Sequence, residues 1–158
     1  MKITDFYNYK KPGPGISMLT AYDYTLASIA AESAVDCVLI GDSLAMVMHG
    51  QASTIAATTD LMALHTAAVA RAVRNKLVIG DMPFLTMRKG LGPAMDAVEA
   101  LARAGAQAVK IEGLDGHGDL IAHIVQSDMP VMGHLGLTPQ SLNRLGGYRT
   151  QGRDQASA

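Results

Sequence analysis

Two aspartates follow short apolar runs of the same form, and they are the first sign of chemistry in this sequence. Asp42 lies in VLIGDSLAM, and Asp81 lies in LVIGDMPFL. An isolated carboxylate at the end of a buried strand is strongly disfavoured unless something offsets its charge. Because both aspartates follow Ile-Gly, we expect their carboxylates to lie at the same level of one sheet and to share a cation.

A lysine and a glutamate add to this charged group. Lys110 and Glu112 stand two residues apart in the apolar run AVKIEG, a spacing that puts both side chains on one face of a strand. They could form a simple structural ion pair, since buried charges need partners. Three carboxylates with one lysine, however, leave a surplus of negative charge that a divalent cation would neutralise. Oxygen ligands suit Mg²⁺, Mn²⁺ or a similar hard ion.

Two further polar residues, Asp23 and His134, also fall at the ends of predicted strands. If these strand ends meet on one face, both residues join the carboxylates in a single site. The alternative for each is a structural role, because an aspartate after a strand is often a turn former or a helix cap. The other four histidines fall in predicted helices or loops, where packed or solvated positions are expected: His49, His65, His117 and His123.

Short apolar runs alternate along the chain with longer stretches of helical spacing. Five runs have the character of parallel strands buried on both faces: 17–23, 37–43, 77–84, 108–113 and 130–136. Four stretches between them are predicted to be helices: 23–34, 58–73, 92–106 and 118–128. Thr58, Thr59 or Asp60 can cap the second of these helices.

This alternation predicts an α/β fold with a parallel sheet and right-handed crossovers. The sheet could be open and doubly wound, or it could be part of a (β/α)8 TIM barrel. No strand is followed by the G-x-G-x-x-G pattern of a dinucleotide-binding sheet, so the barrel is favoured. In a barrel the carboxyl ends of the strands converge on the face where active sites are built.

Composition limits the classes of partner. The chain has 158 residues, a length that suits one domain, with 13 basic and 14 acidic residues and a net charge of -1. Without a basic cluster, neither nucleic acid nor a membrane is an expected partner. Only 17% of residues are charged, so we expect surface to be buried between copies of the chain. The lone Cys37 lies in an apolar run, and with no leader-like segment we expect a cytoplasmic location.

Seven segments, taken together, resemble a known enzyme family. They are TAYDY (20–24), GDSL (41–44), HTAAV (65–69), DMPF (81–84), AGAQAVKIEG (104–113), GHLGLTPQS (133–141) and GGYRTQGR (146–153). In this order, and over essentially the whole chain, they resemble the ketopantoate hydroxymethyltransferase family of pantothenate biosynthesis. The resemblance implies transfer of a one-carbon unit from 5,10-methylenetetrahydrofolate to 3-methyl-2-oxobutanoate, which gives 2-dehydropantoate.

The resemblance also implies roles for individual residues. It places Asp42, Asp81 and Glu112 at the metal positions, with Mg²⁺ the expected ion, and it surrounds the 2-oxo acid with Ser43, Asp42, Asp81 and Lys110. A metal chelated by the substrate would stabilise the enolate formed when the C3 proton leaves. Lys110 and His134 are expected to support catalysis. The family forms large homo-oligomers, typically decamers, so a homo-oligomer is expected.

A complete barrel of this kind takes about 250 residues, so we expect 1–158 to be a single partial barrel domain of about five β/α units. Residues 1–16 would be a lead-in and 142–158 a flexible C-terminal loop. The family's catalytic base is a glutamate in a following segment, resembling L-E-C-V-P, that these residues do not contain. Three interpretations stay open. The chain is part of an active transferase that is completed by further residues or by another polypeptide, or it is a truncated, inactive segment that binds metal or assembles. It could also be part of another metal-dependent 2-oxo acid lyase or mutase.

Overall fold

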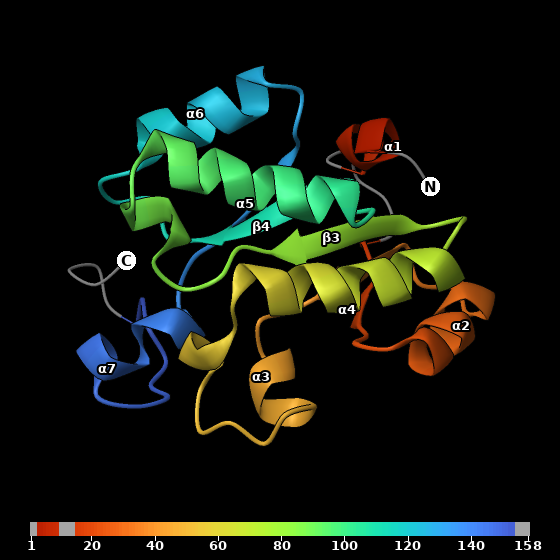
Figure 1. Ribbon diagram of the computed structural model, residues 1–158, viewed down its shortest axis with the longest axis horizontal. Coiled ribbons are helices and arrows are strands. Elements are labelled where there is room, and N and C mark those ends of the chain that lie inside the picture. The colour runs from red at the N-terminus through yellow and green to blue at the C-terminus, as the bar shows by residue number, and fades with distance from the viewer. Residues whose placement is uncertain (1–2, 10–14, 154–158) are drawn as a thin grey trace.

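The computed structural model describes residues 3–9 and 15–153. Within them, five parallel strands form one sheet in the order β1-β2-β3-β4-β5 and alternate with helices along the chain (Figure 1). The strands are β1 (Met18–Thr20), β2 (Cys37–Ile40), β3 (Leu77–Asp81), β4 (Ala108–Glu112) and β5 (Val131–His134). All five predicted strands are therefore confirmed, although each is shorter than the apolar run that predicted it.

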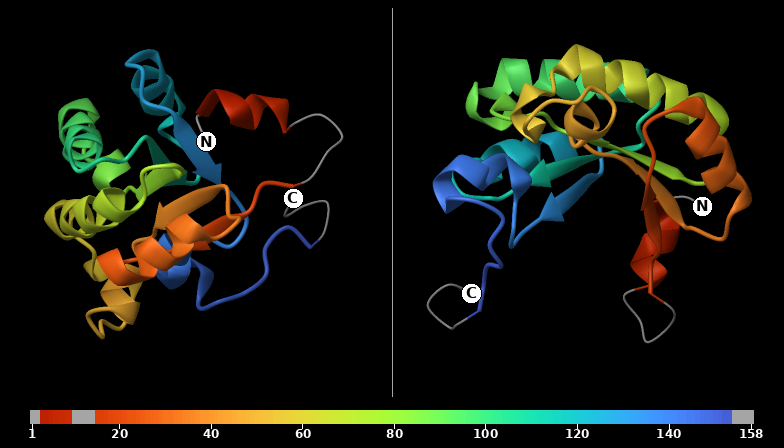
Figure 2. Two further views of the ribbon diagram at one scale, coloured as in Figure 1. Left: turned by 90° about the vertical axis from the view of Figure 1, so that its right-hand side faces the viewer. Right: turned by 90° about the horizontal axis from the view of Figure 1, so that it is seen from below.

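Four helices connect these strands and lie along the convex side of the curved sheet (Figure 2). They are α2 (Tyr24–Glu32), α4 (Thr59–Ala72), α5 (Leu91–Arg103) and α6 (Gly118–Gln126). The cap of α4 is Thr58, whose hydroxyl accepts a hydrogen bond from the backbone N–H of Leu61. Parallel β-α-β units of this kind build one side of a barrel, which agrees with the predicted fold class.

The two faces of the sheet bury different apolar groups because successive strand residues point to opposite sides. Val38 and Ile40 of β2 pack under the helices, in the main core cluster. Cys37 and Leu39 point to the concave side, where they join Leu77, Ile79 and Ala108. The helix α1 (Ile3–Asn8) contributes Ile3 and Phe6 to this inner cluster, at the end of the sheet where the strands begin. Cys37 is thus a buried core residue, as predicted.

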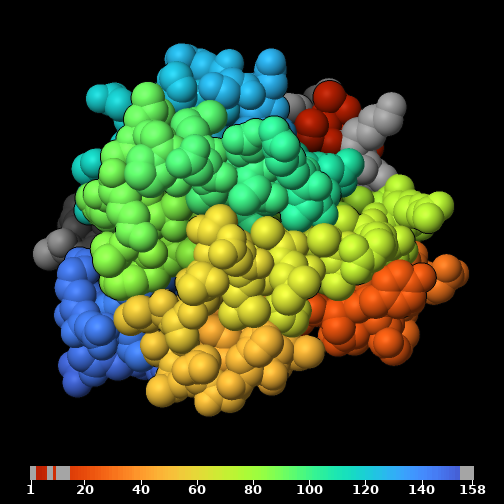
Figure 3. Space-filling view, viewed as in Figure 1, coloured from red at the N-terminus to blue at the C-terminus, as the bar shows by residue number. Residues whose placement is uncertain are grey.

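Short helices fill the connections that the sequence pattern left open. They are α3 (Leu44–Val47), η1 (Thr54–Ala56), η2 (Thr86–Arg88), η3 (Pro139–Ser141) and α7 (Leu142–Leu145). In the space-filling view the segment around α3 lies beside α4, and the C-terminal segment in blue lies next to it (Figure 3). None of the helices in the described part of the chain is both long enough and apolar enough to cross a membrane.

Helices also form in the two terminal segments, 1–16 and 142–158, which were expected to be a lead-in and a flexible loop. In the segment 1–16, α1 forms because Ile3 and Phe6 pack against the inner face of the sheet. In the segment 142–158, expected to be a loop, the chain first forms α7, which ends at Gly146 in the left-handed region (φ 66°). Glycine ends helices in this way at no steric cost. Residues 1–2, 10–14 and 154–158 of these two segments lie outside the described residues.

Candidate active site

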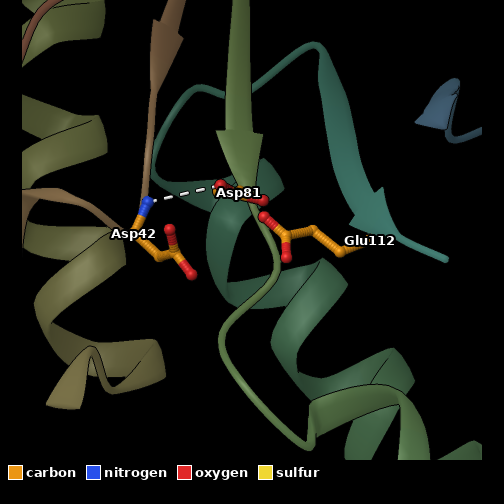
Figure 4. A group of neighbouring side chains, drawn as sticks. All are labelled: Asp42, Asp81 and Glu112. Carbon is orange, nitrogen blue, oxygen red and sulfur yellow. Dashed lines mark hydrogen bonds between the residues drawn. The ribbon is translucent and has the colours of Figure 1, made fainter. Parts of the chain in front are cut away.

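Three carboxylates from three neighbouring strands meet at the carboxyl edge of the sheet. Asp42 lies two residues after β2, while Asp81 and Glu112 are the last residues of β3 and β4. One oxygen from each lies within 4.8 Å of the others, and the three side chains point toward one another (Figure 4). The backbone N–H of Asp42 donates to Oδ2 of Asp81 over 3.3 Å. The predicted convergence of the two Ile-Gly-Asp segments is confirmed.

Lys110 supplies the positive charge of this cluster. Lys110 is the partner of Asp81 in the β3–β4 register. Its Nζ lies 2.8 Å from Oδ2 of Asp81 and 3.3 Å from Oε1 of Glu112. The predicted pairing of Lys110 with Glu112 on one strand face is therefore present, with Asp81 as a second and closer partner. Both Lys110 and Asp81 are buried. One ammonium thus faces three carboxylates.

Burial and the surplus of negative charge shift the pKa values of the residues in this cluster. Burial raises the pKa of Asp81 to about 7, and the charge of Asp42 adds to the rise, although Lys110 opposes it. Burial also raises the pKa of Asp42, with Glu112 contributing repulsion. For Lys110, burial lowers the pKa, but Asp81 and the other carboxylates outweigh it, so the pKa lies above its ordinary value.

These residues fit a hard divalent cation. Among the described residues, Oδ1 of Asp81 is buried and has no hydrogen-bond partner, which is costly for a carboxylate oxygen unless something binds it. The donors are all oxygen atoms and the charge around them is uncompensated. Both properties match the coordination preferences of Mg²⁺ and similar ions.

Gln140 forms hydrogen bonds with two of the three carboxylates, and the sequence analysis did not identify it as a site residue. Its side-chain amide lies in η3 and donates to Oδ2 of Asp42 (2.9 Å) and to the carbonyl of Met82 (2.8 Å). Its backbone N–H donates to Oε2 of Glu112 over 3.0 Å. The segment GHLGLTPQS, which contains Gln140, was the only available signal.

Ser43, the residue after Asp42, contacts Tyr22, a second residue that the sequence analysis did not identify. The Oγ atom of Ser43 lies 2.7 Å from the hydroxyl of Tyr22, with which it forms a hydrogen bond. Ser43 precedes α3 without capping it, so its hydroxyl is not used by the helix. A Cβ at Gly41 would lie 2.9 Å from this Oγ atom, so the present position of the Ser43 hydroxyl leaves no room for a side chain there.

The two remaining strand-end candidates have different outcomes. His134 lies opposite Glu112 in the β4–β5 register, and its Nδ1 is 3.4 Å from Oε1 of Glu112 without hydrogen-bond geometry. It therefore borders the cluster. The expectation that Asp23 joins the site is wrong, because its carboxylate caps α2 and accepts from the N–H of Leu26 over 2.8 Å. Asp23 therefore has the structural role of a helix cap.

Comparison with curated proteins identifies relatives over the whole chain. The chain is 54% identical to the 3-methyl-2-oxobutanoate hydroxymethyltransferase of Bdellovibrio bacteriovorus, over 97% of this chain and 58% of that protein. It is 53% identical to the protein of that name from Coxiella burnetii, over 100% of this chain and 60% of that one. It is 52% identical to the protein of that name from Legionella pneumophila, over 100% of this chain and 61% of that one. The chain thus spans about three fifths of the length of these relatives.

Solved structures agree with the fold. A 2,3-dimethylmalate lyase of the PEP mutase/isocitrate lyase superfamily superposes with a TM-score of 0.64 at 20% identity, over 82% of this chain and 50% of that one. A phosphonopyruvate hydrolase in complex with oxalate and Mg²⁺ gives a TM-score of 0.64 at 11% identity, over 84% and 50%. The sheet therefore has the fold of part of a TIM barrel. The sequence model described as Ketopantoate hydroxymethyltransferase matches residues 1–158, and the chain belongs to that family.

Proposed function

We propose that this chain carries the metal-binding half of an active site that transfers a hydroxymethyl group from 5,10-methylenetetrahydrofolate to 3-methyl-2-oxobutanoate, giving 2-dehydropantoate. The observation that carries the proposal is the buried cluster of three carboxylates around one lysine, at the end of the barrel where active sites are built. The relatives bear the name of this transferase, which supports the choice of substrate.

Asp42, Asp81 and Glu112 would hold a divalent ion, with Mg²⁺ the proposed one. When bound, such an ion supplies Lewis-acid polarisation of the 2-oxo group of the substrate. Gln140 keeps Asp42 and Glu112 at their present separation by bonding to both of them. The unpartnered Oδ1 of Asp81 is the oxygen most in need of a ligand.

The substrate would bind through Ser43, Lys110 and the two aspartates. The Lys110 ammonium is buried and fixed between Asp81 and Glu112, so it needs little rearrangement to face negative charge that develops on the substrate. The Ser43 hydroxyl is hydrogen-bonded to Tyr22, which fixes the position of its Oγ atom for a contact with a substrate oxygen. His134 would support the reaction through its contact with Glu112.

Abstraction of the C3 proton needs a general base, which typically contributes about 10²–10⁴-fold in rate. Lys110 is held as a cation by its carboxylate neighbours, so it cannot accept that proton in its present surroundings. In the family the base is a glutamate of a segment that residues 1–158 do not contain. We therefore propose that these residues bind and polarise the 2-oxo acid, and that the glutamate-bearing segment completes the site.

The test is exchange of deuterium into C3 of 3-methyl-2-oxobutanoate, with Mg²⁺ present. The 158-residue chain alone is expected to give no exchange above a metal-only control, and a version extended through the glutamate-bearing segment is expected to restore it. Adding 5,10-methylenetetrahydrofolate should then give 2-dehydropantoate. Exchange by the short chain would instead assign the base to a residue present here, with His134 the first suspect. Retro-aldol cleavage without folate-dependent transfer would favour the lyase alternative.

Association between copies and a cytoplasmic location belong to the same proposal. Several large apolar side chains on the helices are exposed, including Ile29 (65%) of α2 and Leu64 (66%) of α4. Both residues are candidates for burial against another copy of the chain. Sedimentation of the protein as an oligomer would agree with this, and a stable compact monomer would contradict it.

A further inference from the structure

Two histidines contact each other outside the carboxylate cluster. His49 lies in the connection after α3, and His65 lies on α4. Their Nε2 atoms are 2.9 Å apart, and the two rings are nearly perpendicular, with an interplanar angle of 89°. The sequence pattern assigned these histidines separately to a loop and a helix. The fold brings together two side chains that both bind transition metals well.

The protonation of His65 is fixed by a backbone group. Its Nδ1 lies 2.5 Å from the carbonyl oxygen of Tyr22, and a carbonyl oxygen can only accept, so Nδ1 carries the proton. In the neutral ring, the Nε2 atom of His65 then presents a lone pair toward His49. Histidines that bind metals usually donate their other ring N–H to a carbonyl or carboxylate in this manner, which orients the ring.

We propose that His49 and His65 form a second metal site, which takes an ion that prefers imidazole nitrogen, such as Cu²⁺, Ni²⁺ or Zn²⁺. Without metal, Nε2 of His49 donates its proton to Nε2 of His65. The side chain of His49 is exposed, so its ring can turn and water can carry that proton to its Nδ1. Both Nε2 lone pairs then face the ion.

The separation of the two nitrogens suits this role. Two nitrogens at about 2.05 Å from a metal lie about 2.9 Å apart when they bind at a right angle, and about 3.3 Å apart in a tetrahedral site. The observed 2.9 Å matches the first arrangement, which Cu²⁺ and Ni²⁺ favour, and is within a small ring movement of the second. Water would supply the remaining ligands.

The site is chemically distinct from the carboxylate cluster. The cluster offers oxygen atoms only and suits a hard ion, whereas the histidine pair offers nitrogen. An ion at the pair would tie the connection after α3 to α4, and through the carbonyl of Tyr22 to the segment that follows β1. We therefore expect its binding to raise the midpoint of thermal unfolding.

The experiment titrates the purified protein with Cu²⁺ while excess Mg²⁺ occupies oxygen sites. Electron paramagnetic resonance of the first equivalent of Cu²⁺ is expected to show coupling to two imidazole nitrogens. His49→Gln should remove that signal and weaken Cu²⁺ binding by more than the roughly 10–100-fold that loss of an outer-shell partner costs. His65→Gln should do the same, and calorimetry with Ni²⁺ and Zn²⁺ should rank the variants in the same order.

His123→Gln is the matched control, since His123 is an exposed histidine of α6 and its loss should change neither the spectrum nor the affinity. Asp81→Asn should likewise leave the nitrogen-coupled signal in place, which separates this site from the proposed function. Circular dichroism checks that each variant is folded. If His65→Gln does not fold, the result for His49→Gln is sufficient to test the proposal. A wild-type spectrum without two nitrogens, or an unchanged spectrum in His49→Gln, would overturn the proposal.

Discussion

Asp81 should make the metal-free protein less stable as the pH rises. A pKa raised from 3.8 to about 7 corresponds to about 4 kcal/mol that ionisation of this carboxyl costs the fold, at about 1.4 kcal/mol for each pH step. Because the folded-state pKa is the higher one, the stabilising contribution is complete below pH 4 and is lost as the pH rises through 7. Whole domains have about 5–15 kcal/mol of stability, so this loss is large.

The perturbation is Asp81→Asn, which keeps the shape of the side chain and removes its charge. Between pH 5 and pH 8 the free energy of unfolding of the wild type should fall by about 2–3 kcal/mol through Asp81 alone. The raised pKa of Asp42 acts in the same direction. The variant should lose the part of this fall that comes from Asp81, and at pH 8 without metal it should be more stable than the wild type.

The assay is urea unfolding followed by circular dichroism, at pH 5 and pH 8, in a chelator and then in excess Mg²⁺. Mg²⁺ binds the ionised carboxylates, so it should stabilise the wild type more at pH 8 than at pH 5, and it should stabilise Asp81→Asn little at either pH. Asp96→Asn makes the same chemical change at an exposed position of α5 and should follow the wild type. An equal loss of stability between pH 5 and pH 8 in wild type and Asp81→Asn would refute the reasoning.

Two further substitutions test the residues that hold the cluster. Gln140→Ala removes the 2.9 Å hydrogen bond to Asp42, so we expect about 1–3 kcal/mol less stability in urea and weaker Mg²⁺ binding in calorimetry; unchanged Mg²⁺ affinity would show that Gln140 does not position the carboxylate. Gly41→Ala should displace Ser43 from Tyr22, because the added Cβ would lie 2.9 Å from the Ser43 hydroxyl. Its loss of 2-oxo acid affinity should match that of Tyr22→Phe, and the double variant should lose no more than either; additive losses would mean that the two residues act separately.

The sheet and the carboxylate cluster could be predicted because each depends on a short local pattern. A buried parallel strand is a run of apolar residues, and the polar residues at its carboxyl end lie at the edge of the sheet. Asp42 and Asp81 could therefore be placed without knowing the fold in detail. Asp23 also follows an apolar run, although without the Ile-Gly pair, and it caps a helix. Sequence cannot distinguish a cap from a ligand when both are aspartates after a strand.

The missed residues depend on the path of the chain over longer distances. Gln140 contacts Asp42 across 98 positions of sequence, from a loop whose direction no periodicity encodes. Tyr22 reaches Ser43 across 21 positions, and His49 reaches His65 only because the connection after α3 returns to α4. Each contact requires two irregular segments to be placed at once, and apolar spacing carries no information about that.

The order of the strands in the sheet, which is also their order in the chain, bears on how the protein folds during synthesis. Each strand pairs with the one made just before it, so a β-α unit can dock onto the growing sheet as soon as it leaves the ribosome. Contacts between neighbours in sequence cost little loop entropy and form quickly. The carboxylate edge is assembled in the same sequence, with Asp42 placed first and Glu112 last. The nascent chain therefore meets the repulsion between Asp42 and Asp81 as soon as β2 and β3 have paired, and the lysine that relieves it arrives later, on the same strand as the third acid.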